Sequence, residues 1–476
     1  MTTALPQATQ VPADAEDVAT TLAAQLAETR AWLDELVRIP SISALPEHRG
    51  DVRRGAERTA ELLSEAGLEH VQLLELEGVH PYVTGSWLHA GPDAPTVLLY
   101  AHHDVQPVGP PERWASEPFT PTERGGRLYG RGSADDKAGI LAHVAAIRAW
   151  LTARGELPVN VKVIIEGEEE LGSPNLTAFL ERYGDLLRAD VIVLTDLVNH
   201  KIGWPSLTTT LRGMADVRVR VRSLEQPVHS GMWGGAVPDA FTGTIALLAT
   251  LHDADGAIAV PGFADDVRPL SDAERGRLNA LDEDPDELRE EVRMLDGVRF
   301  VGDPGRSLFE RLWAQPTITP VGMDVPSVAN AANTLLSDVE TKLSCRLAPG
   351  QDPDRALQAL TDHLVANAPW GMRVEVSLGE RNPAWVMEPG GPAWDAAVDA
   401  MTAAYGREPA VLGCGGSIPF VEPFSDAFDG APCLLVGIED PASNAHGDDE
   451  SLHLEDFAKA CLAEAFLLGN LAATSR

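Results

Sequence analysis

The sequence predicts an α/β fold in which a mostly parallel β-sheet is flanked by helices and carries an inserted α+β two-layer sandwich. Two patterns support this prediction. Short apolar runs alternate with helical stretches near both ends of the chain, and a different, strictly alternating pattern fills the middle. The length of 476 residues also exceeds what one hydrophobic core usually serves, so two domains are expected.

Four short apolar runs end abruptly in ionisable residues. They are TVLLY before AHHD, VKVII before EGEEE, DVIVL before TD, and APCLLVGI before EDPASNAHGDD. The stretches 20–37, DKAGILAHVAAIRAWL and NLTAFLERYG have helical patterns. Runs of Val, Ile and Leu separated by helices are typical of a parallel sheet covered on both faces. Because ligands bind beyond the carboxyl ends of such strands, the ionisable residues mark the expected site.

From residue 211 to residue 384 apolar and polar residues alternate. ADVRVRVRS, SDVETKLSCRLAPG and GMRVEVSLGE have the period of a sheet with one wet face, and FTGTIALLATLHD and DRALQALTDHLVANA have helical patterns. We therefore expect 211–384 to be an inserted domain, and 1–210 with 385–476 to form the domain that surrounds it. The segment 253–324 is charged and helical in places, and no element is assigned to it.

The composition argues against several classes of partner and location. A net charge of −35 disfavours nucleic acid and anionic membranes, since both bind basic surfaces. No stretch approaches the length of a membrane span, and the start, MTTALPQATQVPADAED, lacks the pattern of a signal peptide. The four cysteines form no CxxC pair and are expected to be reduced thiols. We therefore expect a cytoplasmic protein.

Two of the ionisable clusters contain candidate site residues, and each has a simpler interpretation. In YAHHDVQPV, His102 and Asp104 point the same way on an extended segment, as in sites where a carboxylate orients a metal-bound imidazole. Adjacent histidines after a strand also occur as ordinary loop residues. In GRGSADDKAG, Asp135 and Asp136 precede a helix, and for this pair alone N-capping is the better interpretation.

The remaining candidates are a cluster of glutamates and two isolated residues. EGEEELGS places Glu168, Glu169 and Glu170 after a buried strand, where carboxylates repel one another unless solvent or a cation neutralises them. A solvated run of charges and a cation site explain this cluster about equally well. Asp196 in VIVLTDLVN and His446 in SNAHGDD carry no signal by themselves.

Together these residues predict a metal centre. Two histidines and at least three carboxylates leave the ends of different predicted strands. Such ligands suit zinc, manganese or cobalt rather than a thiolate site, and one carboxylate can bridge two ions about 3.5–4 Å apart. The sequence contains no HExxH, GxxxxGK[ST] or GxSxG motif for a competing chemistry.

The motifs also resemble those of a known family. HHDVQPV, GRGSADDKAG, EGEEELGS, the strand with Asp196, VHSGMWGG, GCGGSIP and NAHG have the order and similar spacing of the two-metal exopeptidase and deacylase family. That family holds carnosine dipeptidase, glutamate carboxypeptidase, acetylornithine deacetylase and succinyl-diaminopimelate desuccinylase. The resemblance spans nearly the whole chain, and DVQPV, HSGMWGG and GGSIP are most similar to the carnosine-type branch.

The resemblance implies two divalent metal ions, with zinc expected first and manganese or cobalt as alternatives. Asp135 would bridge the ions, His102 and Asp196 would complete the shell of one, and Glu170 and His446 that of the other. It also implies a homodimer formed through the inserted domain, which would serve as a lid and dimerisation domain.

The resemblance assigns the general base to Glu169, the residue before the ligand Glu170. Alignment on Gly172 and Ser173 gives this position, although the additional Glu168 leaves an ambiguity of one residue. Asp104 would orient His102.

On the inserted domain, His229 in VHSGMWGG would reach the partner subunit's site and stabilise the oxyanion. Without the resemblance, a lone histidine in a glycine-rich turn is more often structural. Arg346 would bind the substrate carboxylate, the alternative being a solvated strand face. Gly416 and Ser417 would contact substrate, the alternative being a plain loop. Ala138 departs from the family pattern, which has glycine at this position.

Hydrolysis of dipeptides by a metal-bridged hydroxide is therefore the predicted function, with small-molecule substrates and no nucleic-acid or membrane partner. An N-acyl amino acid deacylase of the same family is the alternative within this chemistry. An inactive metal-binding scaffold is the alternative from another class, and a full ligand set together with a base at Glu169 argues against it.

Overall fold

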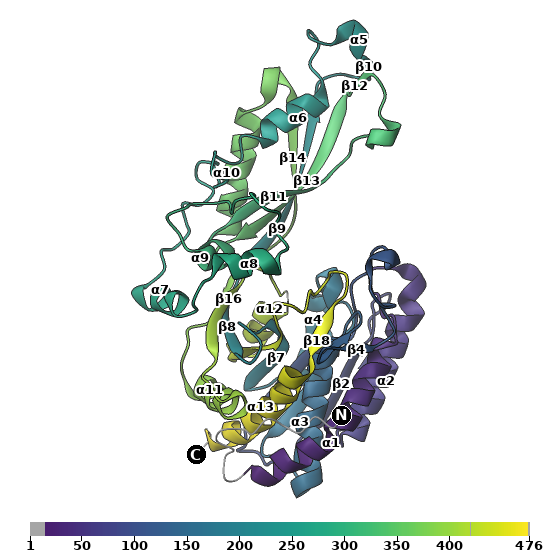
Figure 1. Ribbon diagram of the computed structural model, residues 1–476, viewed down its shortest axis with the longest axis vertical. Helices are drawn as coiled ribbons and strands as arrows, with labels where there is room; N and C mark the ends of the chain where they lie inside the picture. The colour runs from purple at the N-terminus through teal and green to yellow at the C-terminus, as the bar shows by residue number, and fades with distance from the viewer. Residues whose placement is uncertain (1–14, 419, 475–476) are drawn as a thin grey trace. The chain divides into compact units, whose positions relative to one another are not determined.

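The structure is a computed structural model that describes residues 15–418 and 420–474. The segment 1–14 lies outside the described residues, and with it most of the stretch for which the sequence predicts no signal peptide. The chain divides into two compact units (Figure 1). The first comprises Met1–Thr209, Met387–Leu412 and Ile418–Arg476, and the second comprises Thr210–Val386 and Gly413–Ser417. The segment 413–417, which the sequence predicts in the surrounding domain, groups with the second unit because it is hydrogen-bonded to Arg212.

The first unit contains a mixed sheet with the strand order β1-β2-β6-β3-β7-β17-β8. The four strands β6, β3, β7 and β17 are parallel to one another, whereas their neighbours on either side run antiparallel. The predicted parallel arrangement therefore holds at the centre of the sheet. The strands are β1 (Glu69–Leu74), β2 (Tyr82–Trp87), β3 (Thr96–His102), β6 (Asn160–Glu166), β7 (Val191–Val198), β8 (Ser206–Leu211) and β17 (Cys433–Glu439).

Helices cover both faces of this sheet. One face packs in a large apolar core against α1, α2, α3, α11 and α13. On the other face, Tyr82 stacks on Phe179 of α4, and Tyr100 contacts Phe420 at the start of α12. The helices are α1 (Glu16–Val37), α2 (Arg49–Glu65), α3 (Lys137–Arg154), α4 (Leu176–Leu187), α11 (Pro392–Tyr405), α12 (Val421–Ala427) and α13 (Leu454–Ala473).

A small three-stranded sheet of the first unit joins segments that lie far apart in the sequence. It consists of β4 (Thr122–Arg124), β5 (Arg127–Tyr129) and β18 (Ser451–His453) in the order β18-β5-β4. The pairing of β5 with β18 brings the loop after residue 130 close to the loop before residue 451. Both loops carry candidate metal ligands.

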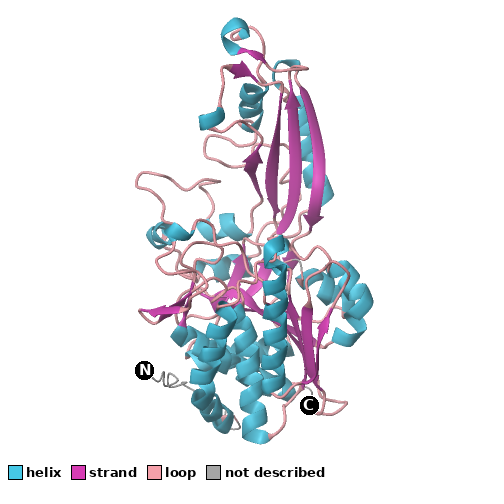
Figure 2. Ribbon diagram, turned by 90° about the vertical axis from the view of Figure 1, so that its right-hand side faces the viewer, coloured by secondary structure: helices cyan, strands magenta, loops and turns pink. Residues whose placement is uncertain are grey.

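The second unit is built on an antiparallel sheet with the order β11-β13-β9-β14. Its strands appear long and side by side in Figure 2. Alternate residues of β9, including Val217, Val219 and Val221, are buried in a core with α6 and α10. The sheet consists of β9 (Gly213–Arg222), β11 (Thr317–Met323), β13 (Asp338–Leu347) and β14 (Arg373–Asn382), and α6 and α10 span Ala240–Leu248 and Pro353–Ala366.

The segment 253–324, to which the sequence assigns no element, contains three short helices before it enters β11. They are α7 (Asp272–Asn279), α8 (Pro285–Glu291) and α9 (Leu308–Trp313). The remaining short elements of the unit are β10 (Val228–His229), α5 (Ser230–Trp233), β12 (Thr334–Leu335) and β15 (Trp385–Val386), and β16 (Ala410–Cys414) pairs with β8.

Among residues 15–418 and 420–474, no helix is long and apolar enough to cross a membrane. Cys345, Cys433 and Cys461 are buried, Cys414 is half-buried, and all four are free thiols. The cysteines therefore agree with the prediction that they form no disulfide.

Ala138, which replaces the family glycine, fits the first turn of α3 without strain. It is fully buried and is not among the residues with positive φ. The residue that needs to be glycine is its neighbour, Gly139. A Cβ atom at Gly139 would clash with the carboxylate of Asp136 and would lie 2.5 Å from the backbone oxygen of Thr195.

We predict opposite effects for the same substitution in two helices. Gly139→Ala should lower the free energy of unfolding by about 3 kcal/mol, because the added methyl group forces α3 away from β7. Gly184→Ala in α4 should raise the free energy of unfolding by about 0.5–1 kcal/mol, because its Cβ meets open space and alanine favours a helix. Urea denaturation of both variants measures this, and equal midpoints would contradict the close packing at Gly139.

Candidate metal centre

Five predicted ligands from five segments meet at the carboxyl end of the parallel strands. His102 ends β3, Asp196 lies in β7, and Asp135 precedes α3. Glu170 lies in the 3₁₀ turn Glu169–Leu171 after β6, and His446 lies in the loop after β17. The parallel register positions two of them, because Tyr100 pairs with Leu194, and His102 and Asp196 each lie two residues beyond this pair.

The carboxylate of Asp135 lies between the two histidines. Its Oδ1 is 3.0 Å from Nε2 of His102, and its Oδ2 is 3.0 Å from Nε2 of His446. The Nε2 atom of His102 is also 3.6 Å from Oδ1 of Asp196, and that of His446 is 3.1 Å from Oε2 of Glu170. Asp135 thus takes part in two adjacent groups of potential ligands, one oxygen directed to each.

These separations fit ligands around metal ions. Two ligand atoms at tetrahedral angles and about 2.0–2.1 Å from a zinc ion lie about 3.3 Å apart, within the range seen between the imidazole and carboxylate atoms. The Nε2 atom of His102 is buried and makes no hydrogen bond within the described chain. Its Nδ1 lies 3.1 Å from the backbone oxygen of Asp104 and 3.5 Å from its carboxylate. A neutral imidazole with its proton on Nδ1 would present the Nε2 lone pair to an ion.

The charges of the cluster also call for a cation. Hydrogen bonds to Asp135 and Glu170 raise the pKa of His446 to about 11. Burial raises the pKa of Glu170 to about 7, and burial likewise raises the pKa of Asp196. Burial opposes a charged ring at His102, yet nearby carboxylates, Asp196 foremost, raise its pKa well above the usual value. The protein alone therefore leaves several buried carboxylates without enough positive charge, and divalent ions would supply it.

The two aspartates that precede α3 have different surroundings. Asp136 caps the helix, since its Oδ1 accepts a hydrogen bond from the backbone N–H of Gly139 at 3.1 Å. Its Oδ2 accepts one from the backbone N–H of His102 at 3.2 Å. The capping interpretation therefore applies to Asp136, which leaves Asp135 as the member of the pair that faces the two histidines.

The three consecutive glutamates differ in the same way. Glu168 is buried and its carboxylate accepts hydrogen bonds from Tyr82 at 3.1 Å and Asn175 at 3.2 Å. The carboxylate of Glu169 has no hydrogen bond or ion pair within the described chain, and burial raises its pKa well above the usual value. The carboxylate of Glu170 accepts hydrogen bonds from Gln106, whose backbone N–H is 3.1 Å from Oε1 and whose side chain is 2.8 Å from Oε2.

Asp104 links the first histidine to the glutamate turn. Its Oδ2 accepts a hydrogen bond from the backbone N–H of Glu170 at 3.1 Å, while its Oδ1 faces His102. Burial works against a charged carboxylate here, but the hydrogen bond and charge of His102 hold the pKa of Asp104 below its usual value.

Glu439 is a buried residue at this site that sequence reasoning missed. It ends β17, and its carboxylate can share an ion with those of Asp135 and Asp196. Burial first, then the charges of Asp135 and Asp196, raise the pKa of Glu439 well above its usual value. The available signal was its position directly after a buried apolar run, the same signal that marked the other carboxylates.

Among the predicted residues of the second unit, Arg346 lies beside Ser417 and its neighbour Gly416, whereas His229 lies on a different element. Arg346 lies on the half-buried face of β13, and its Nη1 donates a hydrogen bond to Oγ of Ser417 at 3.0 Å. Ser417 in turn donates to the backbone oxygen of Arg212 at 2.5 Å. Gly416 donates its backbone N–H to Sγ of Cys414. His229 is exposed before the short helix α5, and its Nδ1 accepts a hydrogen bond from the backbone N–H of Gly231.

Arg212 is a second residue that sequence reasoning missed. Its guanidinium donates to the backbone oxygens of Gly415 at 2.9 Å and Gln315 at 3.2 Å. Burial and the neighbouring charge of Arg346 lower the pKa of Arg212 to about 10. Neither arginine forms an ion pair within the described chain, so the pair carries an uncompensated positive charge suited to a carboxylate or another anion.

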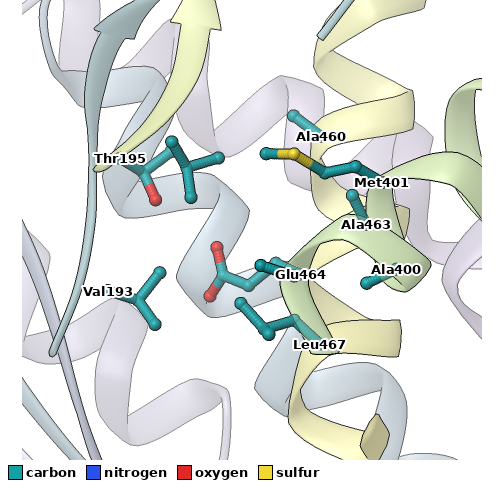
Figure 3. A pocket seen from close by; sticks show the side chains of 10 residues that line it. Val193, Thr195, Ala400, Met401, Ala460, Ala463, Glu464 and Leu467 are labelled. Carbon is teal, nitrogen blue, oxygen red and sulfur yellow. The ribbon is translucent and has the colours of Figure 1, made fainter. Parts of the chain in front are cut away.

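A mainly apolar pocket of the first unit does not belong to the ligand cluster. It lies between β7, β17, α11 and α13, and Figure 3 shows Thr195 and Glu464 facing it. Because successive residues of a strand point to opposite faces, Asp196 points away from the pocket that Thr195 lines. The carboxylate of Glu464 lies 2.7 Å from Nδ1 of the buried His143, which accounts for this ionisable residue.

Comparison with known proteins identifies relatives over most of the chain. The sequence pattern described as peptidase family M20/M25/M40 matches residues 98–468. The chain is 35% identical over 444 residues to the cysteinylglycine-S-conjugate dipeptidase of Corynebacterium striatum, covering 92% of this chain and 94% of that protein. It is 31% identical over 398 residues to the human Beta-Ala-His dipeptidase, covering 82% and 77%.

Solved structures agree with these sequence relatives. The crystal structure of human carnosine dipeptidase 1 has a TM-score of 0.86 and 27% identity, covering 98% of this chain and 100% of that chain. The α/β fold class and the family resemblance inferred from the motifs are therefore confirmed. Because the family pattern spans more than half of the sequence, the chain belongs to peptidase family M20/M25/M40 and is a metallopeptidase, a metal-dependent hydrolase.

Proposed function

We propose that this protein hydrolyses the amide bond of dipeptides with the help of two divalent metal ions. The observation that carries the proposal is the position of Asp135, whose two oxygens each lie 3.0 Å from a histidine nitrogen. This arrangement suits a carboxylate that bridges two ions. Relatives of the chain that bear the names of dipeptidases support the choice of substrate class.

In this proposal Asp135 would bridge the ions, His102 and Asp196 would hold one, and Glu170 and His446 would hold the other. When bound, the ions supply Lewis acidity, which lowers the pKa of a coordinated water and polarises the scissile carbonyl. Zinc is the ion we propose first, because imidazole and carboxylate ligands suit it, and the same ligands accept manganese or cobalt.

Glu169 acts as the general base in this proposal. Its carboxylate takes a proton from the attacking water and passes it to the amine that leaves. Burial raises the pKa of Glu169. A raised pKa suits a carboxylate that must hold this proton between the two steps. Asp104 fixes the ring of His102 through Nδ1, so that Nε2 remains free to bind an ion.

Residues of the second unit recognise the substrate in this proposal. The guanidinium of Arg346 binds the free carboxylate of the substrate, and Ser417 and Gly416 contact it nearby. The absence of an ion-pair partner for Arg346 within the described chain supports this role. His229 donates a hydrogen bond to the oxyanion in the active site of the partner subunit of a homodimer, and the second unit forms the dimer contact. Its exposure supports a role outside its own unit.

We also propose a cytoplasmic location. The four free thiols suit a reducing compartment, because secreted proteins usually pair their cysteines.

A panel of substrates tests the proposed function. We expect metal-free protein to be inactive and to gain activity on unprotected dipeptides after addition of Zn²⁺, Mn²⁺ or Co²⁺, because the ions neutralise the ligand cluster. Parallel assays contain N-acetyl and N-succinyl amino acids, which keep the free carboxylate but lack the free amino end. Release of amino acids from the acylated compounds alone would favour the deacylase, and inactivity with every metal and substrate would favour the inactive scaffold.

Glu169→Gln should lower kcat by about 10²–10⁴ while the protein still binds two ions, because only the proton-accepting group is lost. Glu168→Gln is the matched control, since Glu168 already accepts hydrogen bonds from Tyr82 and Asn175. If Glu169 is the base, this control should keep kcat within about threefold of the wild-type value. Steady-state kinetics combined with elemental analysis measures both quantities, and the reverse ranking of the variants would assign the base to Glu168.

If His229 acts across a dimer, two inactive variants should complement each other. Subunits with Glu169→Gln supply an intact His229, and subunits with His229→Ala supply an intact Glu169. After subunit exchange, a mixed dimer contains one site with both groups, so equal mixing should restore about a quarter of wild-type activity. Failure to recover activity after exchange is verified by mass spectrometry, or a monomer by light scattering, would contradict the role in the partner's site.

A further inference from the structure

We propose that the buried ion pair of Arg131 and Glu450 positions Asp135 and His446 for the metal ion that Glu170 and His446 would hold. This ion is called the second ion below, and the ion of His102 and Asp196 the first. The inference rests on the proposed two-metal function and goes beyond it, because neither residue is a ligand. Both belong to the first unit, and their side chains are 2% and 0% exposed. They join the two loops that the β5–β18 pairing brings together.

The carboxylate of Glu450 holds the loop that carries Asp135. Its Oε1 accepts hydrogen bonds from the backbone N–H groups of Ala134 at 3.0 Å and Asp135 at 3.2 Å. Its Oε2 accepts a third from the backbone N–H of Gly132 at 2.9 Å. One carboxylate therefore fixes the backbone of the proposed bridging ligand and of two residues before it.

The guanidinium of Arg131 connects this carboxylate to the loop that carries His446. Its Nη1 donates to Oε2 of Glu450 at 2.7 Å. Its Nη2 lies 3.1 Å from the backbone oxygens of both His446 and Gly447. Asp135 and His446 are thus connected through two buried side chains, although more than 300 residues separate them in the sequence.

The conformation of the second loop explains why His446 needs such support. His446, Asn444 and Asp449 all have positive φ, at 62°, 54° and 58°. Residues other than glycine keep this conformation only where their surroundings determine it. The side chain of His446 is 59% exposed, so packing does little to fix its ring. The hydrogen bond that Arg131 donates to the backbone oxygen of His446 therefore holds the loop from which Nε2 reaches Asp135 and Glu170.

The charges of the pair add a second reason for its position. The negative charge of Glu450 near Asp135 would add to the repulsion within the ligand cluster if it were unpaired. Arg131 neutralises it through a direct hydrogen bond, so Glu450 can bind three backbone N–H groups without contributing net charge to the site. The ion pair therefore fixes the loop of Asp135, whereas an unpaired carboxylate at this position would compete with the ligands for the ions.

Titration of the metal-free, full-length protein with Mn²⁺ tests the inference. Glu450→Gln should bind the second ion about 10–100-fold more weakly, the usual effect of disturbing groups that orient ligands. The first ion should lose less affinity, because His102 and Asp196 stay in place. Arg131→Lys keeps a positive charge beside Glu450 but loses the guanidinium group that contacts both Glu450 and the backbone of His446. The second ion should again bind more weakly. His446→Ala provides the reference for loss of a ligand. Electron paramagnetic resonance of free Mn²⁺ gives both stoichiometry and affinity.

Glu464→Gln is the matched control for loss of a buried carboxylate, because Glu464 pairs with His143 away from the ligand cluster. It should lower the melting temperature of the metal-free protein yet keep the full rise in Tm when Mn²⁺ is added. The Glu450 and Arg131 variants should lose part of that rise. Binding of two ions by both variants within twofold of wild-type affinity would overturn the inference. Binding of fewer than two ions by the wild type would instead overturn the two-metal function on which it rests.

Discussion

Repulsion among carboxylates at the carboxyl end of β3, β6, β7 and β17 is the constraint on which the first unit depends. The structure satisfies some of these groups with its own donors. Asp136 binds backbone N–H groups, Glu168 binds Tyr82 and Asn175, and Glu450 binds Arg131. The carboxylates of Asp135 and Asp196 instead face histidines, and that of Glu170 faces His446 in addition to its hydrogen bonds from Gln106. Nearby carboxylates raise the pKa values of His102 and His446. Contact with these two histidines therefore distinguishes the carboxylates that call for a cation from Asp136, Glu168 and Glu450.

The parallel sheet explains why these groups meet at all. Parallel strands end at the same edge, so His102 at the end of β3 and Asp196 near the end of β7 become neighbours although about 90 residues separate them. The small sheet of β5 and β18 performs the same task for the loops of Asp135 and His446. The two groups of ligands thus depend on two strand registers, one in each sheet. The ion pair of Arg131 and Glu450 joins the two loops that the β5–β18 register brings together.

The sequence predicted those features that leave a local pattern. Buried apolar runs identified the four parallel strands, and alternation identified β9, β13 and β14. The antiparallel edges were not predicted, because direction is set by pairing rather than by composition. Pattern alone also could not separate Asp135 from Asp136, since both precede a helix and only the fold shows which one caps it. Arg212 and the Arg131–Glu450 pair were missed because their roles arise from contacts between residues far apart in the sequence. Glu439 was missed although its position after a buried apolar run was a local signal. The roles assigned to the site residues stay predictions.

The two units make opposite electrostatic demands. The first unit gathers carboxylates whose charge requires cations, and cations polarise the carbonyl of an amide. The second unit places Arg212 beside Arg346 with no acidic partner for either within the described chain, and burial together with the charge of Arg346 lowers the pKa of Arg212 to about 10. Two adjacent guanidinium groups repel each other until an anion binds. Under the proposed function, the free carboxylate of the substrate supplies that anion, so a compound without a free carboxylate leaves the arginine pair unsatisfied. This requirement favours exopeptidase substrates over internal segments of long chains.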